Sequence, residues 1–475
     1  MTWEHIIFII NLALILSVVF IEHKNPSEAL MWVAVLSILP VMGIVFYLIF
    51  GSTFGIKITC LIRNTKLHNE YRKSIYNQLE GIKKEHINLD NPLEKKLKGM
   101  IQFNLEYSES LLTEYNDIEQ IISGKDKYEK LFGDIDKAEK SIHIQYYSIH
   151  DDIVGRALVE HLTNKAKEGV QVKVMFDGIG SITTSTRMFL PLIKEGGLVK
   201  RIKPYFTHYR NHRKVVVIDG NIGYIGGMNI GKQYANLDRK KTPWRDTQVR
   251  IKGDGVYLLQ YYFLYDWFYV NKEKELDLEY EAMEELFPPH NIRKVLPCQF
   301  VAGGVNTDKE YIKMSYLKMI SSAADKIIIQ SPYFIPDSSL MDALKMAAAS
   351  GVKIEIMVPN IKPSFFLQPV GDYYIDQLLD YGIKVYRYKG YIHAKTMSID
   401  SVITCIGSVN MDIRSLQVDD EICAFVYDEQ FATEYENIFK NDKKNSLELD
   451  YESFKNRSFG KKVLERFFRL FAPLM

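Results

Sequence analysis

Histidine and lysine recur together at two places in this chain, and the residues that follow them recur at the same distances. The pattern His-x-Lys-x-x-x-x-Asp is formed twice, by His212, Lys214 and Asp219 and by His393, Lys395 and Asp400. In both copies a glycine lies fourteen residues after the histidine and an asparagine seventeen residues after it. With 11 histidines in 475 residues, the composition predicts roughly 0.17 chance copies of the core pattern. Two copies with matching extensions therefore indicate one shared chemistry.

These residue types suit a displacement reaction at a phosphodiester. One neutral imidazole can attack phosphorus near pH 7, and a second can donate a proton to the leaving oxygen. Positive charge and directed donors must surround the non-bridging oxygens, and the two lysines can supply the charge. The further candidate donors are Asn229, Ser408 and Asn410. Because these side chains suffice to stabilise the charge, we expect neither a metal ion nor an organic cofactor.

The two motifs end two similar segments of sequence. Gln145 precedes His212 by 67 residues, and Gln330 precedes His393 by 63. Strands that alternate with helices of about 10–15 residues predict βαβ units, so we expect an α/β fold with two similar halves. The predicted strand, helix and strand cover 141–147, 153–167 and 169–175 in the first half and 326–333, 340–349 and 351–357 in the second. Each motif begins a further strand, whose alternation places the histidine and the lysine on the same face.

The first 56 residues are predicted to form a two-helix transmembrane hairpin. Residues 29–50 are an uncharged apolar run of 22 residues, which as a helix would be about 33 Å long and would match a bilayer core of about 30 Å. Residues 6–21 form a shorter apolar run with Asn11 near its middle. Five basic residues and one acidic residue follow between 57 and 73. The positive-inside rule therefore predicts a multi-pass protein of the cell membrane with its catalytic part in the cytoplasm.

The remainder is divided into a helix-prone connector over 57–120 and two halves over 121–288 and 289–475. Residues 459–475 alternate basic and apolar side chains, which predicts an amphipathic helix either at a lipid interface or against the catalytic part. The net charge of +1 is not the strongly basic charge that indicates binding to nucleic acid, so we expect no nucleic-acid partner. The four cysteines show no disulfide or metal-binding spacing, and the sequence gives no indication of the oligomeric state.

The paired motifs resemble those of the phospholipase D superfamily, in which two HxKxxxxD motifs meet in one active site. The hydrophobic start and the segments 243–246 and 332–337 make the chain most similar to bacterial cardiolipin synthases. This resemblance implies transfer of a phosphatidyl group between two phosphatidylglycerol molecules, which gives cardiolipin and glycerol through a phosphatidyl-histidine intermediate. The alternatives are a phospholipase D hydrolase, a phosphatidyltransferase with another headgroup, an inactive membrane scaffold and a nuclease. The neutral charge and the membrane segment make the nuclease the weakest of these.

The resemblance also implies roles for individual residues. The residues alone leave open which histidine attacks, and the resemblance favours His212 as the nucleophile and His393 as the proton donor. It further implies that Glu421, 28 residues after His393, orients a motif histidine. In the first half Asp246 lies 34 residues after His212, so its assignment to the same task departs from that spacing.

Three positions in or near the motifs are not expected to contact the phosphate. Asp219 and Asp400 belong to the candidate catalytic pattern, but the resemblance places them away from the phosphate, where they fix turns. Gly227 stands where many members of the superfamily have serine, which removes one possible phosphate donor from the first half.

Overall fold

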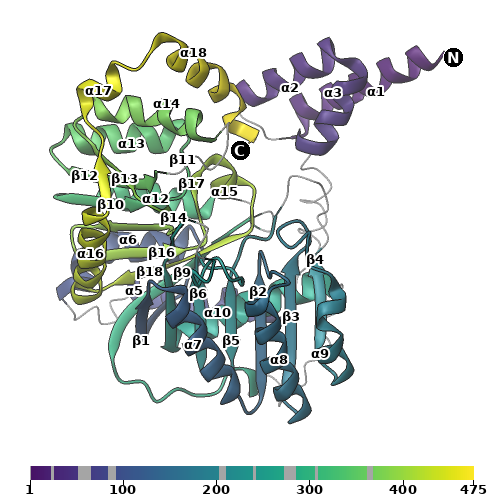
Figure 1. Ribbon diagram of the computed structural model, residues 1–475, viewed down its shortest axis with the longest axis vertical. Coiled ribbons are helices and arrows are strands. Elements are labelled where there is room, and N and C mark those ends of the chain that lie inside the picture. Colours follow the sequence, from purple (N-terminus) through teal and green to yellow (C-terminus); the bar gives the residue numbers. More distant parts are fainter. Residues whose placement is uncertain are drawn as a thin grey trace.

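The computed structural model is an α/β molecule with an extended sheet at its centre and a group of apolar helices beside it (Figure 1). The structure describes residues 2–22, 26–51, 66–83, 92–202, 210–238, 242–271, 285–304, 307, 309–360 and 367–474. The fifteen strands of the sheet lie in the order β19-β13-β12-β10-β15-β16-β18-β9-β1-β8-β6-β5-β2-β3-β4.

Seven strands of each half lie in the same order, so an approximate twofold axis relates the halves. From the edge to the centre, the first half contributes β4 (Leu198–Ile202), β3 (Gln171–Asp177), β2 (Ser141–Tyr146), β5 (Val215–Ile218), β6 (Ile222–Gly226), β8 (Gln248–Gly253) and β1 (Leu112–Ile121). The second half contributes β13 (Lys384–Tyr388), β12 (Lys353–Pro359), β10 (Lys326–Gln330), β15 (Thr396–Ile399), β16 (Ile403–Gly407), β18 (Glu421–Tyr427) and β9 (Val295–Gly303). The short β19 (Ser446–Glu448) extends the second half. Because β1 and β9 pair antiparallel, the halves share one continuous sheet.

Each half is built around the βαβ unit that the sequence predicts. β2 and β3 pair in parallel around α8 (Ile153–Lys167), and β10 and β12 pair in parallel around α13 (Ser338–Ala349). Asp152 and Asp337 cap the two helices by accepting hydrogen bonds from backbone amides of the first turn. These units place the two motif strands, β5 and β15, next to β2 and β10 and in corresponding positions of the two halves.

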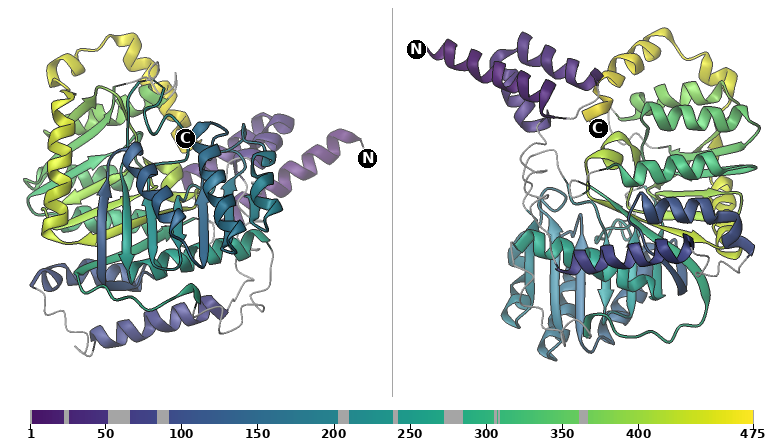
Figure 2. Two further views of the ribbon diagram at one scale, coloured as in Figure 1. Left: turned by 60° about the horizontal axis from the view of Figure 1, so that its bottom comes forward. Right: turned by 180° about the vertical axis from the view of Figure 1, so that it is seen from behind.

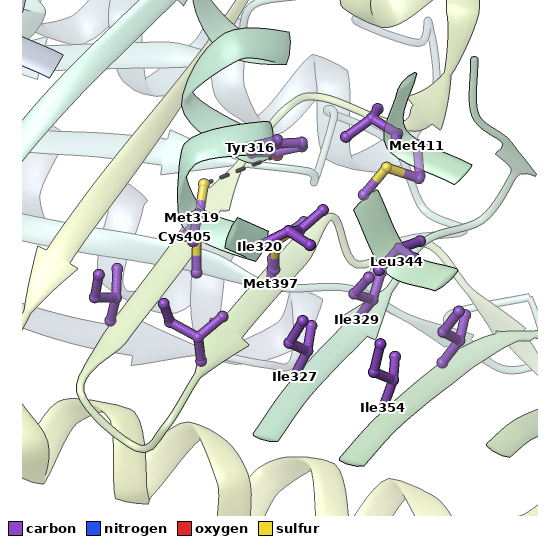
Figure 3. Packing of buried hydrophobic residues seen from close by; sticks show 14 of the residues in the cluster. Tyr316, Met319, Ile320, Ile327, Ile329, Leu344, Ile354, Met397, Cys405 and Met411 are labelled. Atoms are coloured by element: carbon purple, nitrogen blue, oxygen red, sulfur yellow. Dashed lines mark hydrogen bonds between the residues drawn. The ribbon is translucent and has the colours of Figure 1, made fainter. Parts of the chain in front are cut away.

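Helices cover both faces of the sheet, as the two further views show (Figure 2). In the second half, α12 (Tyr311–Ser322) and α13 pack over β10, β15 and β16. Figure 3 shows Ile327 and Ile329 of β10, Met397 of β15 and Cys405 of β16 in this core. α10 (Gly255–Asn271) covers one face of the first half, and α16 (Glu429–Lys444) packs on the second half.

The segment expected to be a helix-prone connector ends in a strand. α5 (Lys66–Lys83) and α6 (Pro92–Glu106) are helical, but β1 follows them and lies at the centre of the sheet. The side chains of β1 alternate between buried positions such as Ile118 and exposed positions such as Asp117 and Glu119. This period of two is the physical reason for a strand, and β1 is one of the two strands that join the halves.

The second apolar run is broken, so the prediction of one continuous helix over 29–50 is wrong. α2 (Pro26–Ile38) ends before Leu39, and α3 (Pro40–Phe46) with the π-helical turn η1 (Tyr47–Gly51) follows it. Proline lacks the amide hydrogen that would continue the helix and restricts the residue before it, and Leu39 has φ −121° and ψ 70°. α3 folds back closely enough that a Cβ at Gly43 would lie 2.6 Å from the Val35 carbonyl oxygen.

α1 (Trp3–Phe20) is the helix among the described residues that is long and apolar enough to cross a membrane. Asn11, the polar interruption of this run, donates hydrogen bonds from Nδ2 to the carbonyls of Ile7 and Pro40, at 3.2 and 2.8 Å. The Asn11 amide nitrogen therefore joins α1 to the start of α3.

Candidate active site

Each motif histidine lies shortly before a strand of its own half and forms a backbone hydrogen bond with the other half. The His212 amide donates to the Asp420 carbonyl at 2.8 Å, and the His393 amide donates to the Arg245 carbonyl at 2.6 Å. Asp420 and Arg245 directly precede Glu421 and Asp246, the two candidate orienting acids. The approximate twofold axis therefore brings the histidine of each half next to the acid of the other half.

The two imidazoles are held in the same way by these acids. His212 Nδ1 lies 2.7 Å from Glu421 Oε1, and His393 Nδ1 lies 2.6 Å from Asp246 Oδ2. All four side chains are buried. Because each Nδ1 atom is bonded to a carboxylate, Nε2 is the ring nitrogen left for attack or proton transfer.

The two motif lysines also occupy matching positions. Lys214 Nζ donates to the His212 carbonyl, and Lys395 Nζ donates to the His393 carbonyl. Burial away from water lowers the pKa of Lys214 to about 7 and that of Lys395 to about 8, and the positive charge of Lys395 contributes to the shift of Lys214. Two buried cations in one place form a site that favours an anion.

The charges of both lysines reach both imidazoles, so the two motifs form one site. Burial, followed by the charges of Lys214 and Lys395, holds the pKa of His212 well below its usual value. Burial and Lys395 lower the pKa of His393 to about 3, against the opposing charge of Asp246. In the free enzyme both imidazoles are therefore neutral near pH 7, which suits a nucleophile, whereas a proton donor must first gain a proton.

The two orienting acids differ in their ionisation. Burial raises the pKa of Glu421 to about 7, although Lys214 opposes this shift. Burial also acts to raise the pKa of Asp246, but His393 and Lys395 outweigh it and the pKa is lowered. Asp246 is therefore ionised at neutral pH, while Glu421 is near the midpoint of its titration. The two halves of the site are similar in geometry but not in charge.

The three further candidate donors are buried near the motifs and already have protein partners. Asn229 accepts from the Ser148 amide at 3.1 Å and donates to Tyr234 Oη at 2.9 Å. Ser408 donates to Glu421, the partner of His212. Asn410 Nδ2 donates to Ser415 Oγ at 3.2 Å. These contacts make the three side chains part of the framework around the imidazoles and lysines.

The two motif aspartates lie in turns away from the imidazoles. Asp219 accepts hydrogen bonds from the backbone amides of residues 139–141, at 2.8 to 2.9 Å. Asp400 accepts from those of residues 324–326, also at 2.8 to 2.9 Å. Both have positive φ, 52° and 50°, which suits a turn. Each aspartate ties the turn after its motif strand to the start of the neighbouring strand, β2 or β10.

Sequence reasoning missed a buried arginine inside the first motif. Arg213 donates from Nη1 to both carboxylate oxygens of Asp266 in α10, each at 2.7 Å. It also donates to the carbonyls of Glu421 and Gly303 in the other half, at 3.2 and 3.1 Å. Arg213 thus connects the backbone of Glu421 to the first half. The sequence did contain a signal for this contact, because an arginine lies between His212 and Lys214 where the second motif has Ala394.

Aromatic side chains beside His393 were also missed. The ring centroids of Trp244 and Tyr391 lie 4.9 and 5.8 Å from that of His393. These two rings are 4.4 Å apart, and Tyr391 Oη lies 3.1 Å from Tyr333 Oη. His212 has Tyr147 edge-on at 4.7 Å. The His393 side of the site therefore has more aromatic surface.

Gly227 leaves the space that Asp246 occupies. A Cβ at Gly227 would lie 2.1 Å from Asp246 Oδ1, whereas the corresponding Ser408 in the other half hydrogen-bonds Glu421. The first half thus combines glycine with the shorter acid, and the second combines serine with the longer one. The missing serine is compatible with the site because the aspartate fills its place.

Gly227→Ser should therefore displace Asp246 from His393 and lower kcat by about tenfold or more, since the imidazole would lose its orienting acid. Gly133→Ser is the matched control, because a Cβ there meets no atom within 4 Å. Initial rates and melting temperatures of both variants check this prediction. A Gly227→Ser enzyme with unchanged kcat would contradict the packing argument.

Comparisons with known proteins agree with this geometry. Residues 131–242 and 316–443 match the family model described as cardiolipin synthase, PLD-like domain, and residues 9–52 match the one described as phospholipase D-nuclease N-terminal. The cardiolipin synthase of Listeria monocytogenes serotype 4b is 36% identical, over 99% of this chain and 98% of its own length. The major cardiolipin synthase of Bacillus subtilis (strain 168) is also 36% identical, over 98% of both chains.

Among solved structures, the phosphatidylserine synthase of Haemophilus influenzae Rd KW20 is similar with a TM-score of 0.62. The match covers 80% of this chain and 97% of that one, at 14% sequence identity. At this identity the likeness concerns the fold alone.

Proposed function

We propose that this chain, which belongs to the cardiolipin synthase family of the phospholipase D superfamily, is a phosphatidyltransferase that converts two phosphatidylglycerol molecules into cardiolipin and glycerol. The observation that carries the proposal is the pair of imidazoles bonded crosswise to Glu421 and Asp246, with two buried lysines that each donate to the backbone of a motif histidine. Such a site can bind one phosphodiester and supply both a nucleophile and a proton donor.

In the first step, His212 Nε2 attacks the phosphorus of one phosphatidylglycerol. The bond from phosphorus to the glycerol headgroup oxygen breaks, and His393, which is protonated once the anionic phosphodiester is bound, gives that oxygen a proton. In the second step, His393 takes a proton from a headgroup hydroxyl of the second phosphatidylglycerol. That oxygen bonds to phosphorus, the bond to His212 breaks, and cardiolipin is complete.

The charge difference between the acids supports this assignment of the histidines. Asp246 is ionised and favours a proton on His393, as an acid in the first step requires. The lysines depress the pKa of His393, and a bound phosphodiester brings a negative charge that opposes their effect. His212 faces the less ionised Glu421 and is suited to remain the neutral nucleophile.

Substrate phosphate would be held mainly by Lys214 and Lys395. Both are buried, so their charges are weakly screened and act strongly on developing negative charge. In this proposal Asn229, Ser408 and Asn410 complete the phosphate site, with Ser408 acting partly through Glu421. Asp219 and Asp400 fix the turns that position the motif strands.

Cardiolipin synthases are membrane-associated, and α1 gives this chain an apolar helix of sufficient length. We further propose a multi-pass anchor with the catalytic part in the cytoplasm, because the basic residues follow the second apolar run. Holding the site at the bilayer presents the hydroxyl of a second lipid at high effective concentration. This allows the lipid to compete with water for the phosphatidyl-enzyme.

The full-length enzyme in phosphatidylglycerol vesicles should form cardiolipin and free glycerol in equal amounts. EDTA should leave the rate largely unchanged, because the lysines supply the positive charge that a metal ion would otherwise provide. Quantitative lipid and glycerol analysis checks both expectations. Phosphatidic acid as the main product would instead indicate a hydrolase, and a product formed only with another alcohol would indicate a different acceptor.

A further inference from the structure

The C-terminal segment that comprises α18 (Phe459–Phe468) and the 3-10 helix η4 (Arg469–Leu474) packs on the catalytic part by one face. Phe468 and Ala472 are buried in a cluster with Val370 of α14 (Leu367–Leu379) and Ile335 of β11 (Phe334–Ile335). On the same face, Glu465 is buried and forms an ion pair with Arg457. The segment therefore has a fixed orientation on the protein.

A second face of this segment is apolar and exposed. Phe459, Val463 and Phe467 are spaced by four residues, so they lie along one side of α18. Their exposed fractions are 80, 46 and 54%, and Leu470 and Phe471 beyond them are exposed by 62 and 41%. We call these five residues the tail apolar face. A contiguous exposed apolar surface of this kind marks a site of interaction.

Basic side chains flank the tail apolar face. Lys462, Arg466 and Arg469 follow one another at spacings of four and three residues and lie on another side of the same segment. Arg469 also contacts Tyr373 of α14. Aromatic and aliphatic residues next to a row of cations are the composition of a helix that lies in the interface of an anionic bilayer.

The position of the tail apolar face agrees with a lipid surface. Figures 1 and 2 show α18 and the C-terminus at the same end of the molecule as the apolar helices α2 and α3. The segment also contacts α15 (Ile413–Gln417), the helix that follows Asn410 and carries its partner Ser415. Contact with a bilayer at this end would hold the second half of the site near the lipid.

We propose that the tail apolar face inserts into the headgroup region of the same anionic bilayer that holds the N-terminal helices. The enzyme would then have two membrane contacts at the same end of the molecule, and its site would be oriented towards its lipid substrates. The orientation towards substrate rests on the proposed function, whereas the membrane contact itself does not.

Site-specific labelling of the full-length enzyme tests the contact. In a Cys60→Ser background, the three remaining cysteines are buried, and Phe467→Cys provides one accessible thiol for an environment-sensitive fluorophore. The vesicles contain phosphatidylglycerol and lipids whose acyl chains carry a quencher near the headgroup. In these vesicles the fluorescence of the label should fall at least twofold. Tyr115→Cys is the matched control, because Tyr115 is exposed by 46% on β1, and its label should remain unquenched.

Equal, weak quenching at both positions would overturn the proposal. Cross-linking between Phe467→Cys thiols of two copies without quenching would do so as well, because a second copy would then cover the face. Cardiolipin formation is measured in the same vesicles. Quenching without cardiolipin would contradict the proposed function alone, and cardiolipin without quenching would contradict only the membrane contact of the tail.

Discussion

His212→Ala should abolish formation of the phosphatidyl-enzyme, whereas His393→Ala should slow both its formation and its breakdown. The physical reason is that His212 forms the bond to phosphorus, while His393 only moves protons to and from the headgroup oxygen. With His393→Ala, or with His393→Asn, some intermediate should therefore accumulate on His212. His161→Ala is the control, since His161 lies on α8 and bonds Asp136 at the surface.

Enzyme exposed to labelled phosphatidylglycerol, stopped under alkaline conditions and digested for peptide mapping, decides the assignment. Label on the peptide that contains His212 is the expected result. Label on the His393 peptide would exchange the roles of the two residues. If neither peptide carried label and both alanine variants remained active, the covalent mechanism itself would be refuted.

The α/β halves and the paired motifs could be predicted from the sequence because their signals are local. The strand signals over 215–218 and 396–399 locate the motif strands directly after Lys214 and Lys395, and the βαβ periodicity identifies the strands beside them. The turn at Asp400 is held by three amides that lie 74 to 76 residues earlier but in the same half. Each of these features is determined within one half.

The crosswise pairing of histidines and acids could not be predicted from local spacing. His212 and Glu421 are 209 residues apart, and His393 and Asp246 are 147 apart, because each acid belongs to the other half. Counting from a histidine to the acid in its own half therefore compared residues that do not bond. The contact of Arg213 with Asp266 of α10 lies within the first half, but its partners are 53 residues apart and no local spacing joins them.

Two other features of the structure differ from the sequence predictions, although the sequence contains a signal for each. In both cases the average composition of the segment hid that signal. Pro40 lies in the middle of the second apolar run, and an uncharged composition does not compensate for its missing amide hydrogen. The alternation of β1 lies among charged residues, so the segment resembles a solvated connector until its buried positions are seen. In both places the order of individual residues decides the structure, and average hydropathy does not.

Lys214→Ala or Lys395→Ala should lower kcat/KM on the order of a hundredfold or more, the usual scale when preorganised charge at a transition state is lost. Both lysines are buried, so water does not take the place of the missing charge. Lys353→Ala is a suitable control, because its side chain is 79% exposed and pairs at the surface with Asp325. Initial rates on phosphatidylglycerol vesicles provide the measurement.

The lowered pKa values of these lysines also predict an alkaline limit. A lysine is charged below its pKa, and in the free enzyme that value is about 7 for Lys214 and about 8 for Lys395. As the pH rises through 7 to 8, the site loses the charge that holds phosphate, so kcat/KM should fall. In Lys214→Arg the side chain stays charged, because the pKa of arginine lies above about 12. Its kcat/KM should be lower at neutral pH but should decline only at higher pH, and an alkaline limb that does not move would show that another group controls it.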